Sequence, residues 1–155
     1  MVPHQVKAFL DETKVPYQVL DHAKAFTAQG VAASLHVSGR EFAKAVIVKK
    51  RDGRLLMAVL PGPRHVDLKA LRELLGAPVE LAREEEFASL FPGCEPGAEP
   101  PFGNIYDLPV YVDESLRHDP EIVFNAGSYT EAIRMKYEDF ERLVRPVVAR
   151  LSTAH

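Results

Sequence analysis

Several stretches of the chain repeat apolar residues at the three- and four-residue spacing of an amphipathic helix. The predicted helices are a first helix ending near Thr13, a second capped by Thr27 and running through Val31 to Leu35 until a turn at Ser38-Gly39, a third over Leu68 to Leu75 between Asp67 and Gly76, a fourth over Arg83 to Leu90, and a last one from about Tyr137. We expect Leu68, Leu71, Leu74 and Leu75 of the third helix to lie in the core, and Phe87 and Leu90 of the fourth to face inward. In the last helix the apolar face continues to Leu151, with a kink or a break at Pro146.

Other stretches are apolar and β-branched over shorter lengths, which is typical of strands. The predicted strands are Tyr17 to Leu20, Val46 to Val48 opened by Lys44, Leu55 to Leu60, Val79 to Leu81, Val110 to Val112, Ile122 to Phe124 and Glu131 to Met135. The sequence Arg51-Asp52-Gly53 joins two of them and is a hairpin signal. Helices and strands alternate irregularly and hairpins are present. The pattern therefore predicts a mixed α/β (α+β) domain over residues 1–155, not a doubly wound parallel sheet.

Two features stand out from this framework. Lys44 opens a strand that we expect to be buried, so it would sit at the mouth of the core, although lysines at strand ends are usually solvated. Pro92 to Gly103 is a loop with four prolines and three glycines. A surface connector is one explanation, but twelve residues is long for a compact domain, and long ordered loops are often functional.

Composition narrows the function classes. A chain of 155 residues with 46% hydrophobic and 26% charged residues suits one globular domain. The net charge of −3 argues against a general nucleic-acid coat protein but leaves room for a local basic patch. The sequence shows no run long enough to span a bilayer and no secretory signal pattern, so we expect a cytoplasmic protein.

The sequence lacks most of the motifs that are typical of catalytic and cofactor-binding sites. The chain has no phosphate-binding Walker loop, no dinucleotide fingerprint and no His-Glu-x-x-His motif, and its histidines lack ligand spacing. We therefore expect neither a metal nor another cofactor. Cys94 is the single cysteine, which excludes an internal disulfide, and it has no adjacent basic residue to activate it as a nucleophile.

Three stretches together resemble the YbaK/prolyl-tRNA synthetase editing-domain family of aminoacyl-tRNA deacylases. They are Ala43-Lys44-Ala45-Val46, Gly97-Ala98-Glu99-Pro100-Pro101-Phe102-Gly103 and Phe124-Asn125-Ala126-Gly127-Ser128-Tyr129-Thr130. Each stretch alone is weak, but the ordered set spans nearly the whole chain. The resemblance implies a curled, largely antiparallel mixed sheet flanked by helices. It also implies hydrolysis of the ester of a mischarged tRNA in trans, with a small amino acid such as alanine or cysteine on the proline-specific tRNA.

The resemblance assigns roles to individual residues. Lys44, Gly97 and Pro101 match the catalytic lysine and the ends of the Gly-x-x-x-Pro loop. The resemblance implies that Lys44 contacts the phosphate of the terminal nucleotide, or the substrate near it, and that the loop holds the ester. Gly103, Asn125, Gly127, Ser128 and Tyr129 are predicted to bind substrate. Many family members carry histidine at the position of Tyr129, which leaves the amino-acid specificity open.

Basic residues beyond Lys44 extend along the same hairpin. We predict that Lys49, Lys50 and Arg51 contact tRNA, although a solvated hairpin end is an equal alternative. Backbone N–H groups of the glycine-containing loop could stabilise an oxyanion, because an activated ester needs positioning more than a strong nucleophile.

The sequence is compatible with three hypotheses about function. The first is the deacylase, whose partners are a mischarged aminoacyl-tRNA and, as a further candidate, a synthetase. The second is a non-catalytic module that binds an aminoacyl or nucleotide-like ligand or docks on a synthetase. The third, direct DNA binding, is disfavoured by the acidic balance and by the absence of a basic recognition helix.

Overall fold

The computed structural model describes residues 2–154. Its α-helices are α1 (His4–Thr13), α2 (Ala28–Ser34), α3 (Leu68–Leu75), α4 (Glu84–Phe87) and α5 (Tyr137–Val144). Its strands are β1 (Tyr17–Asp21), β2 (Ala43–Lys50), β3 (Leu55–Pro61), β4 (His65–Val66), β5 (Val79–Leu81), β6 (Val110–Asp113), β7 (Glu121–Asn125), β8 (Glu131–Lys136), β9 (Val147–Ala149) and β10 (Ser152–Thr153). Short 3₁₀ helices are η1 (Gly39–Glu41), η2 (Ala88–Leu90), η3 (Gly103–Tyr106) and η4 (Glu114–His118).

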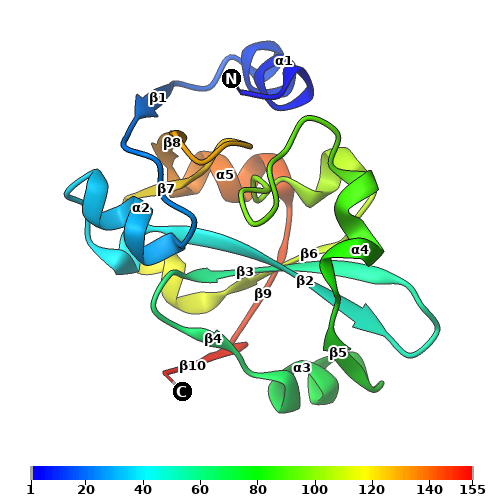
Figure 1. Ribbon diagram of the computed structural model, residues 1–155. Coiled ribbons are helices and arrows are strands. Elements are labelled where there is room, and N and C mark those ends of the chain that lie inside the picture. Colours follow the sequence, from blue (N-terminus) through cyan, green and yellow to red (C-terminus); the bar gives the residue numbers. More distant parts are fainter. Residues whose placement is uncertain (1, 155) are drawn as a thin grey trace.

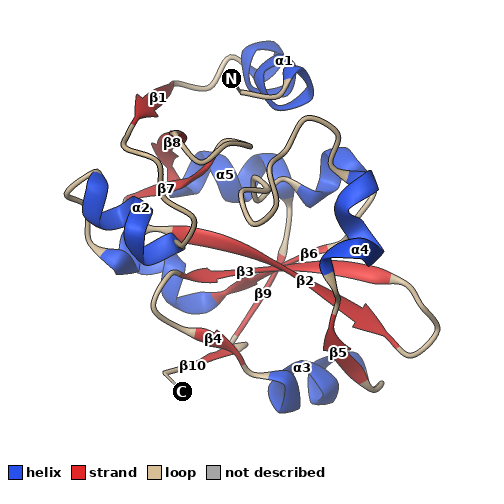
Figure 2. Ribbon diagram, viewed as in Figure 1, coloured by secondary structure: helices blue, strands red, loops and turns tan. Residues whose placement is uncertain are grey.

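The described strands form three sheets (Figure 2). The largest has the order β5-β2-β3-β6-β9, a second has the order β1-β8-β7, and β10 pairs with β4. The pairs β3–β6 and β6–β9 are parallel and the other pairs within the sheets are antiparallel. The predicted mixed, largely antiparallel α/β fold is therefore confirmed.

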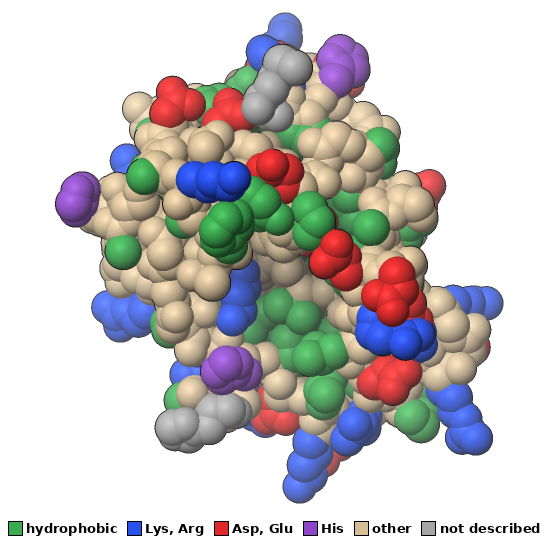
Figure 3. Space-filling view, in the orientation of Figure 1, with side chains coloured by type: hydrophobic (Ala, Val, Ile, Leu, Met, Phe, Trp, Pro, Cys, Tyr) green, Lys and Arg blue, Asp and Glu red, His purple; other side chains and the backbone are tan. Residues whose placement is uncertain are grey.

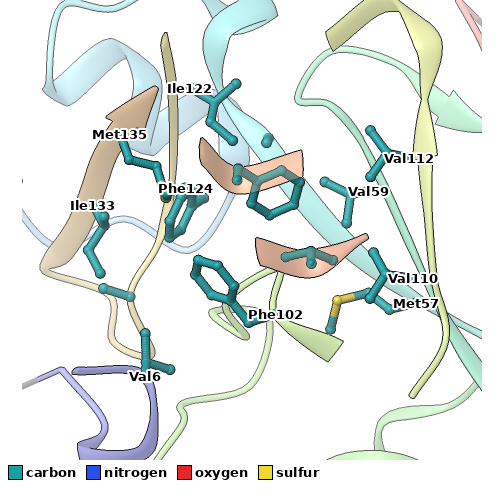
Figure 4. Close-up of a cluster of buried hydrophobic side chains, with 14 of the residues drawn as sticks. Val6, Met57, Val59, Phe102, Val110, Val112, Ile122, Phe124, Ile133 and Met135 are labelled. Atoms are coloured by element: carbon teal, nitrogen blue, oxygen red, sulfur yellow. The ribbon is translucent and has the colours of Figure 1, made fainter. Parts of the chain in front are cut away.

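The five-stranded sheet separates two hydrophobic layers. In Figure 1, α1 and α5 lie on one side of β2 and β3, and α3 lies on the other. The layer toward α1 and α5 is the main core, in which the rings of Phe102, Phe124 and Phe140 meet one another (Figure 4). The layer toward α3 is smaller and contains Leu71 and Val48. No described helix is long and apolar enough to cross a lipid bilayer.

Local signals in the sequence set the ends of several elements. The hydroxyl of Thr27 accepts the N–H of Gly30, and the carboxylate of Asp67 accepts the N–H of Ala70, so both residues cap helices as predicted. Gly76 ends α3 in the left-handed conformation. The predicted turn at Ser38-Gly39 is wrong in detail, because α2 ends at Ser34 and Ser38 caps η1 instead.

The prediction of a last helix continuing toward Leu151 is wrong beyond Val144. After Pro146 the chain extends, and β9 pairs in parallel with β6. The buried carboxylate of Asp113 accepts the N–H of Leu151 at 2.9 Å, which fixes the chain beyond β9. Burial acts to raise the pKa of Asp113, but hydrogen bonds from Ser115, Leu151 and Ser152 outweigh it and lower that pKa.

Two apolar side chains face solvent against expectation. Leu74 of α3 is 46% exposed and Leu90 is 39% exposed. The predicted fourth helix is also divided, since α4 ends at Phe87 and a 3₁₀ turn follows. The helical spacing alone therefore overestimated the buried face of both segments.

The loop from Pro92 to Gly103 is not a simple surface connector. Its first half is largely exposed, but every residue from Ala98 to Gly103 is buried. Phe102 anchors it, since its ring is fully buried and also packs 5.8 Å from the ring centre of Phe9. The loop is therefore held by the main core.

We predict that Phe102→Ala lowers the free energy of unfolding by about 3–5 kcal/mol, because it removes a buried ring from the aromatic cluster and leaves a cavity. Chemical denaturation monitored by circular dichroism measures this loss. Phe26→Ala is the matched control, since the side chain of Phe26 is 64% exposed. A loss for Phe102→Ala no larger than that for Phe26→Ala would show that the loop is not anchored in this way.

Candidate active site

Lys44 is a half-buried lysine near the start of β2. Its ammonium donates a hydrogen bond to the carbonyl of Gly62 at 2.9 Å. Among residues 2–154 no carboxylate lies within ion-pair distance of it, and burial lowers its pKa. A lysine ammonium has three N–H donors, so one contact to a carbonyl leaves donors for an anionic ligand.

The side chain of Lys44 lies in a gap between two hydrophobic clusters. Successive residues of a strand point to opposite faces, so Lys44 shares a face with Phe42 and Val46. Phe42 packs in a cluster with α2, and Val46 packs on the layer that contains α3. Figure 3 shows a hollow with a hydrophobic floor on the α3 side of β2 and β3, rimmed by charged side chains.

The predicted glycine loop and the predicted substrate-binding turn lie against each other. The side-chain amide of Asn125 donates to the carbonyl of Gly97 at 3.3 Å, and the N–H of Gly127 donates to the carbonyl of Ala98 at 2.9 Å. Gly97 and Gly127 both have positive φ, at +82° and +92°, which favours glycine at these positions. Two stretches far apart in the sequence therefore form one wall.

Tyr129 completes this wall through its main chain and its side chain. Its N–H donates to the carboxylate of Glu95 at 2.7 Å, and its hydroxyl donates to the carbonyl of Pro96 at 2.7 Å. Its ring meets Phe26 edge-on, with 4.8 Å between ring centres. Tyr129 is thus tied to the loop.

Glu99 lies inside the loop and was not predicted as a site residue. It is 7% exposed, and its carboxylate accepts the N–H of Gly97 at 3.1 Å. Burial raises its pKa, and the nearby Glu84 adds to that effect. Because the Gly97 N–H is taken by this carboxylate, it could stabilise an oxyanion only if Glu99 moved.

A backbone bridge connects the Lys44 strand to this wall. Phe42 and Val123 form a parallel bridge between the two larger sheets. Lys44 lies two residues after Phe42, and Asn125 lies two residues after Val123. The two residues are therefore at the same level of two neighbouring strands. This register supports a common site for Lys44 and the Gly97 loop, which stays a prediction.

The other predicted residues occupy different surroundings. Pro101 is buried within the second half of the loop. Gly103 begins η3, and a Cβ there would lie 2.9 Å from Val110, so close packing alone accounts for this glycine. Ser128 lies with Gly127 and Tyr129 on the wall of a separate pocket of about 490 Å³.

The three residues predicted to contact tRNA line one pocket of about 420 Å³ at the far end of β2, together with Pro78 to Glu80. Lys49 is paired with Glu86 at 2.6 Å and with Glu80 at 3.3 Å, so its charge is compensated. Lys50 and Arg51 make no ion pair with any residue in the described range. Lys50 lies on the same side of β2 as Lys44, about 20 Å along the strand.

Sequence reasoning missed Phe26, Gly62 and Glu99. The only available signals were weak: an aromatic residue in a polar stretch, a glycine between two prolines, and an acid inside a glycine- and proline-rich loop. A Cβ on Gly97 would lie 4.0 Å from the main-chain carbonyl of Phe26, and the Phe26 ring packs on Tyr129, so Phe26 lies beside the loop. The ammonium of Lys24 lies 5.6 Å from the same ring.

Cys94 also lies in the loop, but its surroundings do not activate it. Burial raises the pKa of the thiol to about 11, with the charge of Glu99 adding to the effect. No group of three or more His, Cys, Asp or Glu residues within 2–154 is placed to hold a metal ion.

Residues 22–143 match the family model described as "Aminoacyl-tRNA editing domain". The "Putative Cys-tRNA(Pro)/Cys-tRNA(Cys) deacylase EbsC" of Enterococcus faecalis is 28% identical over 149 residues, which cover 93% of this chain and 90% of that protein. A proline–tRNA ligase of Bacillus velezensis is 29% identical over 108 residues, or 69% of this chain. The matched region is 19% of the ligase, so the chain corresponds to only a fraction of that protein.

Solved structures show the same fold. The crystal structure of a hypothetical protein matches with a TM-score of 0.88 and 25% sequence identity. The match covers 97% of this chain and 100% of that one. A "putative trans-editing enzyme for prolyl tRNA synthetase" has a TM-score of 0.82 and 24% identity, covering 96% of this chain and 95% of that one.

We predict that Cys94→Ala retains deacylation, because a thiol with a pKa of about 11 is almost entirely protonated at neutral pH and is a poor nucleophile. Treatment with a chelator should also leave the rate unchanged. Single-turnover hydrolysis of a mischarged tRNA measures both effects. A large loss in either experiment would contradict a mechanism that needs neither the thiol nor a metal.

Proposed function

The chain belongs to the aminoacyl-tRNA editing domain family, and from this premise we propose that it is a trans-acting deacylase that hydrolyses the ester bond of a mischarged aminoacyl-tRNA. The observation that carries the proposal is the family match over residues 22–143. A relative of nearly the same extent is named as a deacylase, which supports action in trans.

The site suits an ester more than a bond that needs a strong nucleophile. An activated ester requires a positioned water and stabilisation of the charge that develops on the carbonyl oxygen. The loop that contains Gly97 is rigidly held by Asn125 and by the anchoring ring of Phe102. A preorganised wall of this kind would hold the ester in place for attack by water, so no covalent intermediate with the protein is needed.

We further propose that Lys44 binds the phosphate of the terminal nucleotide of the tRNA. Its ammonium is half-buried, has no carboxylate partner among the described residues and keeps free donors beyond its contact with Gly62. A lysine ammonium is a compact charge suited to a phosphate. Lys50 and Arg51 would contact phosphates farther from the ester, whereas the charge of Lys49 is already used by Glu86 and Glu80.

The finer identity of the substrate is also a proposal. We propose a small amino acid such as alanine or cysteine on the proline-specific tRNA; the name of the Enterococcus relative, which specifies Cys-tRNA(Pro), supports cysteine. A prolyl-tRNA synthetase would then supply the mischarged tRNA and is the partner that we propose. We also propose that the protein acts in the cytoplasm.

We predict that Lys44→Ala lowers kcat/KM for deacylation by about tenfold to a hundredfold, because a charge-assisted contact to phosphate is lost. Lys44→Arg should restore only part of the activity, since the wider guanidinium does not fit a site shaped for an ammonium. Single-turnover assays on alanyl-tRNA and cysteinyl-tRNA measure the effect, and thermal melting checks that each variant is folded.

Lys50→Ala serves as the control for this experiment. Its effect should be smaller and should shrink as salt rises, as expected for a peripheral phosphate contact. If Lys44→Ala turns over mischarged tRNA at the wild-type rate, the assignment of Lys44 is wrong. If the wild-type protein binds charged tRNA without turnover, the protein is a binding module and the proposed deacylase function is wrong.

A further inference from the structure

Glu99 is a buried carboxylate without a cation. It is 7% exposed, and no lysine, arginine or histidine in residues 2–154 lies within ion-pair distance of it. Withdrawing an ionised carboxylate from water is costly unless it is paired. The hydrogen bond from the N–H of Gly97 compensates only part of that cost.

The loop does not need a charge at this position to hold its shape. A neutral amide oxygen would accept the N–H of Gly97 equally well. The carbonyl of Gly97 is held separately by Asn125, and Phe102 anchors the chain that follows. Glu95 in the same loop makes a similar contact, to the N–H of Tyr129, but Glu95 is exposed and its charge is therefore solvated.

The carboxylate lies directly beneath an exposed part of the loop. Gly97 is exposed, so its partner Glu99 lies one hydrogen bond below the surface. The main-chain carbonyl of Phe26 lies beside the same glycine, and the exposed ring of Phe26 packs on Tyr129. A small cationic group that entered next to Phe26 and Gly97 would meet a carboxylate that has no other counter-ion in the described chain.

Resting on the proposed deacylase function, we propose that Glu99 binds the α-ammonium group of the aminoacyl ester and selects substrates that carry a free, protonated α-amine. An α-amino group has a pKa near 8 and is largely charged at neutral pH. A carboxylate has several lone pairs, so it can accept the ammonium and the Gly97 N–H together. The ester carbonyl is two bonds from that nitrogen, which brings it to the same stretch of loop.

An isosteric pair of substrates tests this role. Alanyl-tRNA and lactyl-tRNA, both on the proline-specific tRNA, differ only in an ammonium against a hydroxyl. The enzyme should hydrolyse alanyl-tRNA with a kcat/KM higher by about tenfold to a hundredfold, after each rate is divided by its uncatalysed rate. A wild-type protein that treats the two substrates alike would overturn the proposal without any variant.

Glu99→Gln isolates the charge, because glutamine keeps an acceptor for the N–H of Gly97. The variant should lose activity on alanyl-tRNA, keep its activity on lactyl-tRNA and so bring the ratio close to one. Glu95→Gln is the matched control and should keep the wild-type ratio. Thermal melting of both variants shows that the comparison concerns folded protein.

The outcomes separate this proposal from the one on which it rests. If the wild-type protein hydrolyses neither ester nor any other aminoacyl-tRNA, the deacylase function fails and the assignment of Glu99 fails with it. If the wild-type protein prefers alanyl-tRNA and Glu99→Gln retains that preference in full, the deacylase function stands and the assignment of Glu99 is wrong. A ratio that collapses in Glu99→Gln but not in Glu95→Gln supports it.

Discussion

The main chain at Phe42 joins the parts on which the site depends. Its parallel bridge to Val123 connects the five-stranded sheet to the three-stranded sheet, and its side chain is fully buried. Its carbonyl accepts the N–H of Gly62, whose own carbonyl holds the ammonium of Lys44. Because β7 leads from Val123 directly to Asn125, the same junction sets the level of the loop that Asn125 holds.

Two titratable side chains of opposite sign, the half-buried Lys44 and the buried Glu99, have no counter-ion within ion-pair distance among residues 2–154. Lys44 offers an ammonium and Glu99 offers a carboxylate. Burial lowers the pKa of Lys44 and raises the pKa of Glu99, so it favours the neutral form of each group. Neither arrangement stabilises the fold, since an unpaired buried charge is unfavourable. The end of an aminoacyl-tRNA carries a phosphate and an α-ammonium, and these are the counter-ions that we propose for Lys44 and Glu99.

The loop illustrates how one segment can be packed in one half and exposed in the other. Its buried half, from Ala98 to Gly103, is fixed by Phe102 in the main core. Its exposed half presents Gly97 to solvent. Preorganisation of this kind lets main-chain groups contact a substrate without the entropic cost of ordering a flexible loop.

The sequence by itself determined the local structure and the family. Caps at Thr27 and Asp67, the hairpin at Gly53 and the β-branched run of β2 follow from short-range preferences, and the ordered motifs around Lys44, Gly97 and Asn125 indicated the editing domain. Such features depend on neighbours in the chain, so a pattern can reveal them.

Only the tertiary structure decided the rest. Val147 to Ala149 could extend a helix by spacing, but pairing with β6 and the Asp113 contact to Leu151 made them a strand. Whether Lys49 offers a free charge depended on Glu86, which lies 37 residues away in the chain. The burial of Glu99 likewise depends on segments distant in sequence. Burial and charge pairing arise from contacts between such segments, and a local pattern carries no record of them.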